Sequence, residues 1–188
     1  MADLIFWENS LLTWLVAIVT LIGLYLLLVI FVKLSKKRFS IIFERSSNNS
    51  FLYFLSILEH TKQFFLLVLS FYVAIAWLSL PEKIFLYIRT LFMIMFWVQV
   101  GIWVNHLIIK SIEIRSHQNA DGEDKTTLNA LKTVLRIVTW SIVLILVIDN
   151  IPGVEITALI TSLGIGGIAI GLAVQNILSD LFASLSIS

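Results

Sequence analysis

The chain has 188 residues, of which 59% are hydrophobic and only 13% are charged, and its mean hydropathy is +0.99. A soluble domain of this size could not bury so much apolar surface, so the composition predicts an integral membrane protein. The net charge of +1 gives no argument for nucleic-acid binding, and the lack of cysteine excludes disulfides, thiol catalysis and cysteine-based metal sites.

Hydropathy predicts an all-α membrane protein whose transmembrane helices each have close to the roughly 20 residues that cross a bilayer. The five predicted spans are residues 11–32, 64–80, 84–109, 128–148 and 156–175. The first is not expected to be a cleaved signal peptide, because Asp3 and Glu8 precede it and no small-residue cleavage site follows.

The spans divide the chain into five consecutive parts. Residues 1–63 hold the first transmembrane helix and a basic cytoplasmic connection, and 64–110 form a transmembrane hairpin with an outer turn at Pro81–Lys83. A cytoplasmic loop is predicted at 111–127, followed by the fourth transmembrane helix and an outer turn at 128–153. The last membrane helix and an amphipathic segment occupy 154–188.

Basic residues predict the orientation of the chain, because they concentrate in cytoplasmic loops. Five of them follow the first span: Lys33, Lys36, Lys37, Arg38 and Arg45. That connection is therefore expected on the cytoplasmic side of the membrane. This places the N-terminus on the outer side and the C-terminus in the cytoplasm. Within 39–63, the run "FLYFLSIL" fits either an interfacial helix or an extension of the second span.

Residues 163–181 read "LGIGGIAIGLAVQNILSDL", with many glycines in a membrane helix. Glycine costs about 1 kcal/mol relative to alanine inside a helix, so these positions need a structural reason. At helical spacing, one face carries Gly164, Gly167 and Gly171. The nearly opposite face carries Ser162, Gly166, Ala169 and Ala173. Two small faces allow close packing on both sides, as in a ring of identical helices, whereas one such face would indicate a helix dimer.

Between the two small faces lie Thr161, Ile165, Ile168 and Leu172. In a ring, the three large aliphatic side chains of this set would face the lumen. A narrow pore lined by aliphatic side chains excludes water, and therefore ions, until it widens. The pattern favours a pore with a hydrophobic gate of Ile165, Ile168 and Leu172 over a simple dimer.

A change of polarity at Gln175–Asn176 predicts a break in this last helix. A straight helix over 154–188 would be roughly 52 Å long, well beyond the roughly 30 Å hydrocarbon core. Beyond the predicted break, apolar residues form a stripe on an amphipathic helix suited to the inner membrane interface. The stripe consists of Ile177, Leu178, Leu181, Phe182 and Leu185.

The run "LGIGGIAIGLAVQNILSDLFASLSI" resembles the pore-lining helix of the small-conductance mechanosensitive (MscS-like) channels, over residues 155–188. The resemblance implies a homoheptameric channel of the bacterial inner membrane that opens under tension and releases ions and small osmolytes on hypo-osmotic shock. It assigns Ile168 and Leu172 to two hydrophobic seal rings. It assigns four small residues to helix packing: Gly167, Gly171, Ala169 and Ala173.

The chain departs from the family pattern at the expected kink. Asn176 stands where some members have a kink glycine, and Ser184 stands where a second glycine is usual. The break is then expected to depend on Asn176, whose side chain competes for backbone hydrogen bonds. Family members also continue into a cytoplasmic vestibule, so a chain ending at Ser188 is expected to be a fragment.

Charged and titratable residues elsewhere suggest inner-interface contacts and no cofactor. Lys132 and Arg136 are expected to be positive-inside anchors, with the further hypothesis that they pair with Asp180. His106 is expected to form an interhelical or interfacial hydrogen bond, and neither His60 nor His117 has metal-ligand spacing around it. The expected partners are further copies of the chain and membrane lipids, with no metal and no nucleic acid.

Three other functions remain as alternatives. A secondary transporter would use a glycine-broken helix at its substrate site, but it would also need a paired broken helix that the first four spans do not show. An intramembrane hydrolase is remote, because the membrane serines have no Gly-x-Ser-x-Gly setting, and no enzyme activity is predicted. The isolated chain could also serve as a plain membrane anchor.

Overall fold

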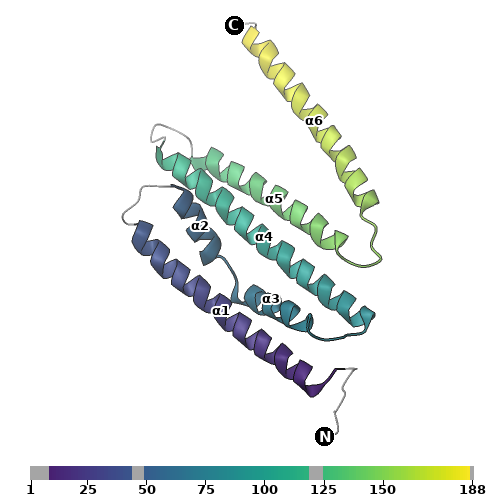
Figure 1. Ribbon diagram of the computed structural model, residues 1–188. Coiled ribbons are helices and arrows are strands. Elements are labelled where there is room, and N and C mark those ends of the chain that lie inside the picture. Colours follow the sequence, from purple (N-terminus) through teal and green to yellow (C-terminus); the bar gives the residue numbers. More distant parts are fainter. Residues whose placement is uncertain (1–8, 44–48, 119–124, 187–188) are drawn as a thin grey trace. The chain divides into compact units, whose positions relative to one another are not determined.

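The computed structural model describes residues 9–43, 49–118 and 125–186. Its elements are all helices: α1 (Leu11–Phe43), α2 (Asn49–Glu59), α3 (Gln63–Ile75), α4 (Glu82–Gln118), α5 (Lys125–Asp149) and α6 (Thr157–Ser186) (Figure 1). Four helices are long and apolar enough to cross a membrane, and a bent helix pair could supply a fifth span. The prediction of a multi-pass all-α membrane protein is confirmed. The chain forms two units, Met1–Asn150 and Ile151–Ser188.

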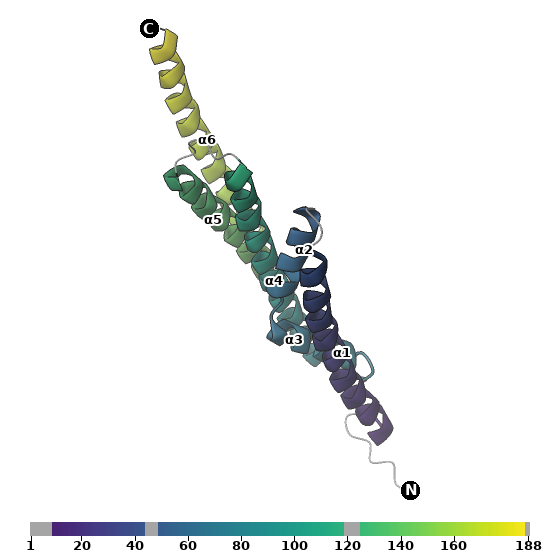
Figure 2. The same cartoon turned by 90° about the vertical axis from the view of Figure 1, so that its left-hand side faces the viewer.

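Helix α4 is the centre of the first unit. It packs against α5 and also against α2 and α3, which in turn pack against α1. In Figures 1 and 2 the two short helices lie between the long helices α1 and α4. The outer surface of α1 is almost entirely aliphatic and exposed, as expected for a helix that faces lipid.

The start of α1 is tied to the turn between α3 and α4. Ser10 Oγ accepts the backbone N–H of Thr13 at 3.3 Å and so caps the helix. The side-chain amide of Asn9 donates to the Ser79 carbonyl at 3.0 Å and accepts the Ser79 N–H at 2.8 Å. Because both polar groups of Asn9 are used, its side chain can be buried at 3% exposure without an energetic penalty.

Helix boundaries differ from the hydropathy prediction where polar residues continue a helix. The loop predicted at 111–127 is helical up to Gln118 and again from Lys125, and 119–124 lies outside the described residues. Hydropathy marks only the apolar part of a helix, whereas lysine, glutamate, arginine and glutamine are good helix formers that extend it. The turn after α3 lies at 76–81, because Pro81, which has no N–H, immediately precedes α4.

The segment 39–63 contains the end of α1 and a separate helix, α2. Helices α2 and α3 are joined by residues 60–62 at a bend of 78°. Helix α2 is therefore not a straight extension of the second predicted span. Helix α3, with 13 residues, is too short to cross a bilayer alone, and the bent α2–α3 pair could supply one span.

The contact between α4 and α5 depends on one buried glycine. A Cβ at Gly101 would lie 2.6 Å from Cγ2 of Val143, which is itself 6% exposed. Small residues allow membrane helices to approach closely, and in lipid this close packing replaces the hydrophobic effect as a source of stability. The valine cannot easily turn away, since β-branched side chains in helices have one strongly preferred rotamer.

We expect Gly101→Ala to lower the free energy of unfolding by about 1–3 kcal/mol, because the new methyl group overpacks the α4–α5 contact. Unfolding by dodecyl sulfate in mixed micelles, followed by circular dichroism, would measure the change. The matched control is Gly23→Ala on α1, where no described atom lies within 4 Å of the new Cβ. The control should be neutral or more stable. Adding Val143→Ala to Gly101→Ala should restore part of the loss, and equal effects at both glycines would contradict the close-packing account.

Candidate functional site

Helix α6 carries the residues predicted to form a pore. The turn before it requires glycine, because Gly153 has a φ of 82°, in the left-handed region. The helix then begins at Thr157, and its first 20 residues, Thr157–Asn176, form the most apolar part. At 1.5 Å per residue this part is about 30 Å long, the thickness of a hydrocarbon core.

The two small faces predicted for this segment exist as faces of a real helix, because α6 is helical throughout their range. Taken by itself, the second unit has no atom within 4 Å of a Cβ placed at Gly164, Gly166, Gly167 or Gly171. Packing inside the unit therefore does not require glycine at these positions. Their small size is available for contacts with other helices.

The large aliphatic side chains of α6 are exposed on two opposite faces. Ile165, Ile168 and Leu172, between the small faces, are 65%, 67% and 57% exposed. Ile170, on the other side of the helix, is also 67% exposed. The hydroxyls of Thr161 and Ser162 donate to carbonyls one turn back, at 2.7 and 2.8 Å. These polar groups are thus satisfied within the helix and are compatible with an apolar environment.

The predicted break at Gln175–Asn176 is not seen. Helix α6 runs without interruption from Thr157 to Ser186, and both residues lie on its exposed surface. No proline follows Gly171, so every later residue has the backbone N–H that a regular helix needs. A competing asparagine side chain alone does not outweigh the regular helical hydrogen bonds. The side chain of Ser184, the other predicted kink residue, lies outside the described residues.

The predicted inner-interface cations lie on α5. Lys132 Nζ is 3.8 Å from Glu113 Oε1 on α4, and both side chains are partly exposed. Arg136 is exposed one turn further along the helix. The predicted pairing with Asp180 is untested, because the side chain of Asp180 lies outside the described residues.

The junction between α2 and α3 is a polar site that the sequence analysis missed. Unwinding at residues 60–62 frees backbone groups from the helical pattern. Gln99 of α4, only 2% exposed, binds two of them. Its Oε1 accepts the Lys62 N–H at 3.1 Å, and its Nε2 donates to the His60 carbonyl at 3.0 Å. One side chain from α4 thus replaces helical bonds that the bend has broken.

Two aromatic residues of α4 hold the same junction. The indole N–H of Trp103 donates to Thr61 Oγ1 at 3.2 Å, and the Thr61 hydroxyl donates to the Ile57 carbonyl at 2.8 Å. The ring of His106 stacks on that of His60, with centroids 3.4 Å apart and planes 22° apart. Gln99, Trp103 and His106, here called the α4 polar stripe, are spaced by four and three residues and so share one helix face. Trp103 is therefore a residue of the junction.

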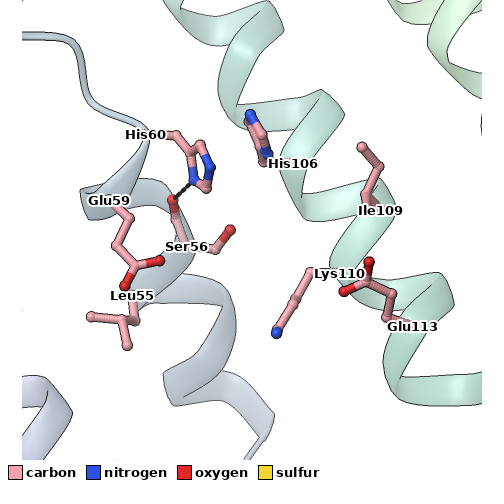
Figure 3. A pocket seen from close by; sticks show the side chains of 8 residues that line it. All are labelled: Leu55, Ser56, Glu59, His60, His106, Ile109, Lys110 and Glu113. Carbon is pink, nitrogen blue, oxygen red and sulfur yellow. Dashed lines mark hydrogen bonds between the residues drawn. The ribbon is translucent and has the colours of Figure 1, made fainter. Parts of the chain in front are cut away.

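A cavity of about 350 Å³ lies beside the stacked histidines, between α2 and α4. Figure 3 shows its lining: Leu55, Ser56, Glu59 and His60 from the α2 side, and His106, Ile109, Lys110 and Glu113 from α4. His60 Nδ1 lies 2.8 Å from the Ser56 carbonyl. Among the described residues no group of three or more histidines and carboxylates could hold a metal ion. Charged side chains of both signs therefore line the cavity.

One sequence signal pointed to this junction. Gln99 is the single strongly polar residue in the run "LFMIMFWVQVGIW", and such residues in membrane helices usually bond to another helix. Its partners could not be deduced, because they are backbone groups of a bend that hydropathy does not mark. His106 was expected to form a hydrogen bond, and in the structure its ring stacks on that of His60.

Comparison with known proteins finds a family match that covers parts of α5 and α6. The family model described as "Mechanosensitive ion channel, transmembrane helices 2/3" matches residues 133–175. The match extends the resemblance backward into the fourth predicted span and ends at Gln175. A curated relative, the "Large-conductance mechanosensitive channel MscMJLR" of Methanocaldococcus jannaschii, is 34% identical over 87 residues. These residues are 45% of this chain and 24% of the relative, so the chain matches about a quarter of that protein's length. No solved structure matches significantly.

We expect Gln99→Leu to lower the free energy of unfolding by about 1–3 kcal/mol, because the Lys62 N–H and the His60 carbonyl lose their partner while the side-chain volume is kept. Gln63→Leu, on the exposed surface of α3, is the matched control and should change stability little. The dodecyl sulfate titration described above measures both variants. If Gln99→Leu were as stable as the unmodified chain, the junction would not depend on these two hydrogen bonds.

Proposed function

We propose that this chain, whose residues 133–175 match transmembrane helices 2/3 of the mechanosensitive channel family, assembles with further copies of itself into a tension-gated pore lined by α6. The observation that carries the proposal is the arrangement of faces on α6. Large aliphatic side chains lie between two small faces, and all of these residues fall inside the segment that matches the family.

The small faces support assembly as a ring. A helix with one small face can pack closely against one neighbouring helix, whereas α6 has a small face on each flank. One flank carries Gly164, Gly167 and Gly171, and the other carries Ala169 and Ala173. Packing the glycine flank of one copy on the alanine flank of the next is a head-to-tail contact, which closes into a ring when the rotation allows. The family resemblance favours seven copies.

The face between the two flanks then points to the ring axis. Ile165, Ile168 and Leu172 would form successive aliphatic rings around the lumen, and such a constriction stops ions by excluding water. Widening the ring increases the membrane area of the protein, so tension favours the open state by its different free energy in the two states. The channel would then release ions and small osmolytes during hypo-osmotic shock.

The cellular placement follows from the same resemblance and from charge. We place the chain in the bacterial inner membrane, with its N-terminus on the periplasmic side and its C-terminus in the cytoplasm. Lys33, Lys36, Lys37 and Arg38 at the end of α1 support this orientation. Lys132 and Arg136 near the start of α5 support it as well.

A secondary transporter is the second candidate, and the bent α2–α3 pair is the observation that favours it. Transporters build substrate sites from broken membrane helices, whose freed backbone groups face the substrate. At this junction, however, Gln99 binds the freed groups of His60 and Lys62. Saturable solute exchange in liposomes without any response to tension would favour the transporter.

The test of the channel compares two isoleucines of α6 that differ in face alone. Ile168 and Ile170 are both 67% exposed and lie two residues apart. In patches from liposomes containing the chain, we expect Ile168→Ser to open at lower suction than the unmodified chain. The serine removes apolar side-chain surface whose exposure to water costs roughly 2 kcal/mol per copy. The free energy of filling the constriction with water is therefore lower. Leu172→Ser should act in the same direction.

Ile170→Ser is the matched control and should leave the threshold nearly unchanged, because its side chain points away from the lumen. Equal shifts in the two isoleucine variants would contradict the assignment of the pore face. Silence under suction from an oligomer that has assembled in the liposomes would contradict the channel itself.

A further inference from the structure

The two stacked histidines join segments that the rest of the junction also joins. His60 is the first residue after α2, and His106 belongs to the α4 polar stripe. Their ring centroids are 3.4 Å apart and the planes are nearly parallel. Two neutral imidazoles, or one neutral and one charged imidazole, can stack in this way. Two imidazolium rings at this separation repel each other strongly, because there is no room for water between them.

The hydrogen bond of His60 determines which of its two ring nitrogens can take up a further proton. His60 Nδ1 lies 2.8 Å from the Ser56 carbonyl, which can only accept, so this nitrogen carries a proton in either charge state. A further proton on His60 must therefore bind at Nε2. The cavity beside the rings, lined by Glu59, Lys110 and Glu113 among others, has room for water next to the pair (Figure 3).

Charged residues lie near the pair on every neighbouring element except α3, which carries none. Glu59 and Glu113 line the cavity, but Glu113 is also within 3.8 Å of Lys132 of α5. Lys62 and Arg136 act electrostatically on His106, and Lys110 lines the same cavity. Lys36 of α1 donates to the Glu59 carbonyl at 3.4 Å. Cations thus outnumber carboxylates, and they oppose a doubly charged pair.

We propose that His60 and His106 form a proton-binding site that latches the α2–α3 junction onto α4, and that the site takes a second proton only when the junction detaches. The coupling is direct, because the backbone carbonyl of His60 and the N–H of Lys62 are the groups that Gln99 binds. Separating the rings pulls on those two hydrogen bonds. Acid therefore loosens the bend, and neutral conditions hold it closed.

The titration of the pair can be observed directly, since the chain has only three histidines. In the His117→Asn background, imidazole ¹⁵N chemical shifts would follow His60 and His106 alone across the pH range. We expect the two rings to take up their protons in two separate steps, the behaviour of strongly interacting groups. Adding His60→Asn or His106→Asn should leave the remaining ring with a single step. A pair that titrates with the same midpoints as the two single histidines would overturn the proposal.

The latch has its own readout in the Lys62 amide, whose hydrogen bond to Gln99 should slow its exchange with solvent. We expect its protection, corrected for the intrinsic exchange rate, to fall about tenfold or more between about pH 7.5 and about pH 5, the range in which histidines take up protons. His106→Phe is the matched control, because it keeps an aromatic ring on His60 but cannot bind a proton. Its Lys62 amide should stay protected at both values.

Two results would refute the latch: unchanged Lys62 protection in the unmodified chain at acid pH, or an equal loss in His106→Phe. The first needs no variant, so it holds even if a substitution disturbs folding. Neither measurement uses ion currents. Their failure would leave the proposed channel standing, and a silent channel would leave the proton site standing.

Discussion

The need to satisfy every backbone polar group inside a bilayer shapes both units of this protein. A broken membrane helix leaves amides and carbonyls without partners, and lipid cannot supply any. The α2–α3 bend is possible because Gln99 provides a donor and an acceptor to the junction at once, while Trp103 binds the hydroxyl of Thr61. Helix α6 meets the same requirement in the opposite way, by continuing unbroken from Thr157 to Ser186. Where no neighbouring side chain replaces the helical bonds, the helix keeps them.

Glycine has two different roles in these helices. Gly101 is buried, and Val143 of α5 occupies the space that its side chain would take. Its role is therefore settled by a contact within the first unit. The glycines of α6 have no such neighbour within the second unit, yet three of them, Gly164, Gly167 and Gly171, fall into one stripe at helical spacing. Since glycine destabilises a helix by about 1 kcal/mol at each position, the stripe makes physical sense as a packing surface for other copies, as in the proposed ring.

Sequence patterns predicted what depends on periodicity and composition. The apolar spans, the helical nature of residues 157–176 and the faces of α6 follow from hydropathy and a repeat of 3.6 residues, and the structure confirms the helices that they require. The bend at residues 60–62, the stack of His60 on His106 and the extension of α4 to Gln118 did not follow. They depend on which groups meet in three dimensions, and a window of local hydropathy contains no such information. The predicted break at Asn176 failed because a polarity change was taken for a change of backbone.

Helix α4 connects the two features that carry the proposals. One of its faces holds the α2–α3 junction through the α4 polar stripe, and Gly101 and Glu113 bring it against α5. Helix α5 in turn leads along the chain directly into the turn that starts α6. If α6 lines the pore as proposed, a displacement of α1 and α3 in the bilayer reaches it through two packed contacts and one covalent connection. At the junction this coupling combines helix packing with a few hydrogen bonds and one ring stack. A proton-sensitive contact there would adjust how firmly the lipid-facing helices are coupled to α4, without altering any residue of the gate.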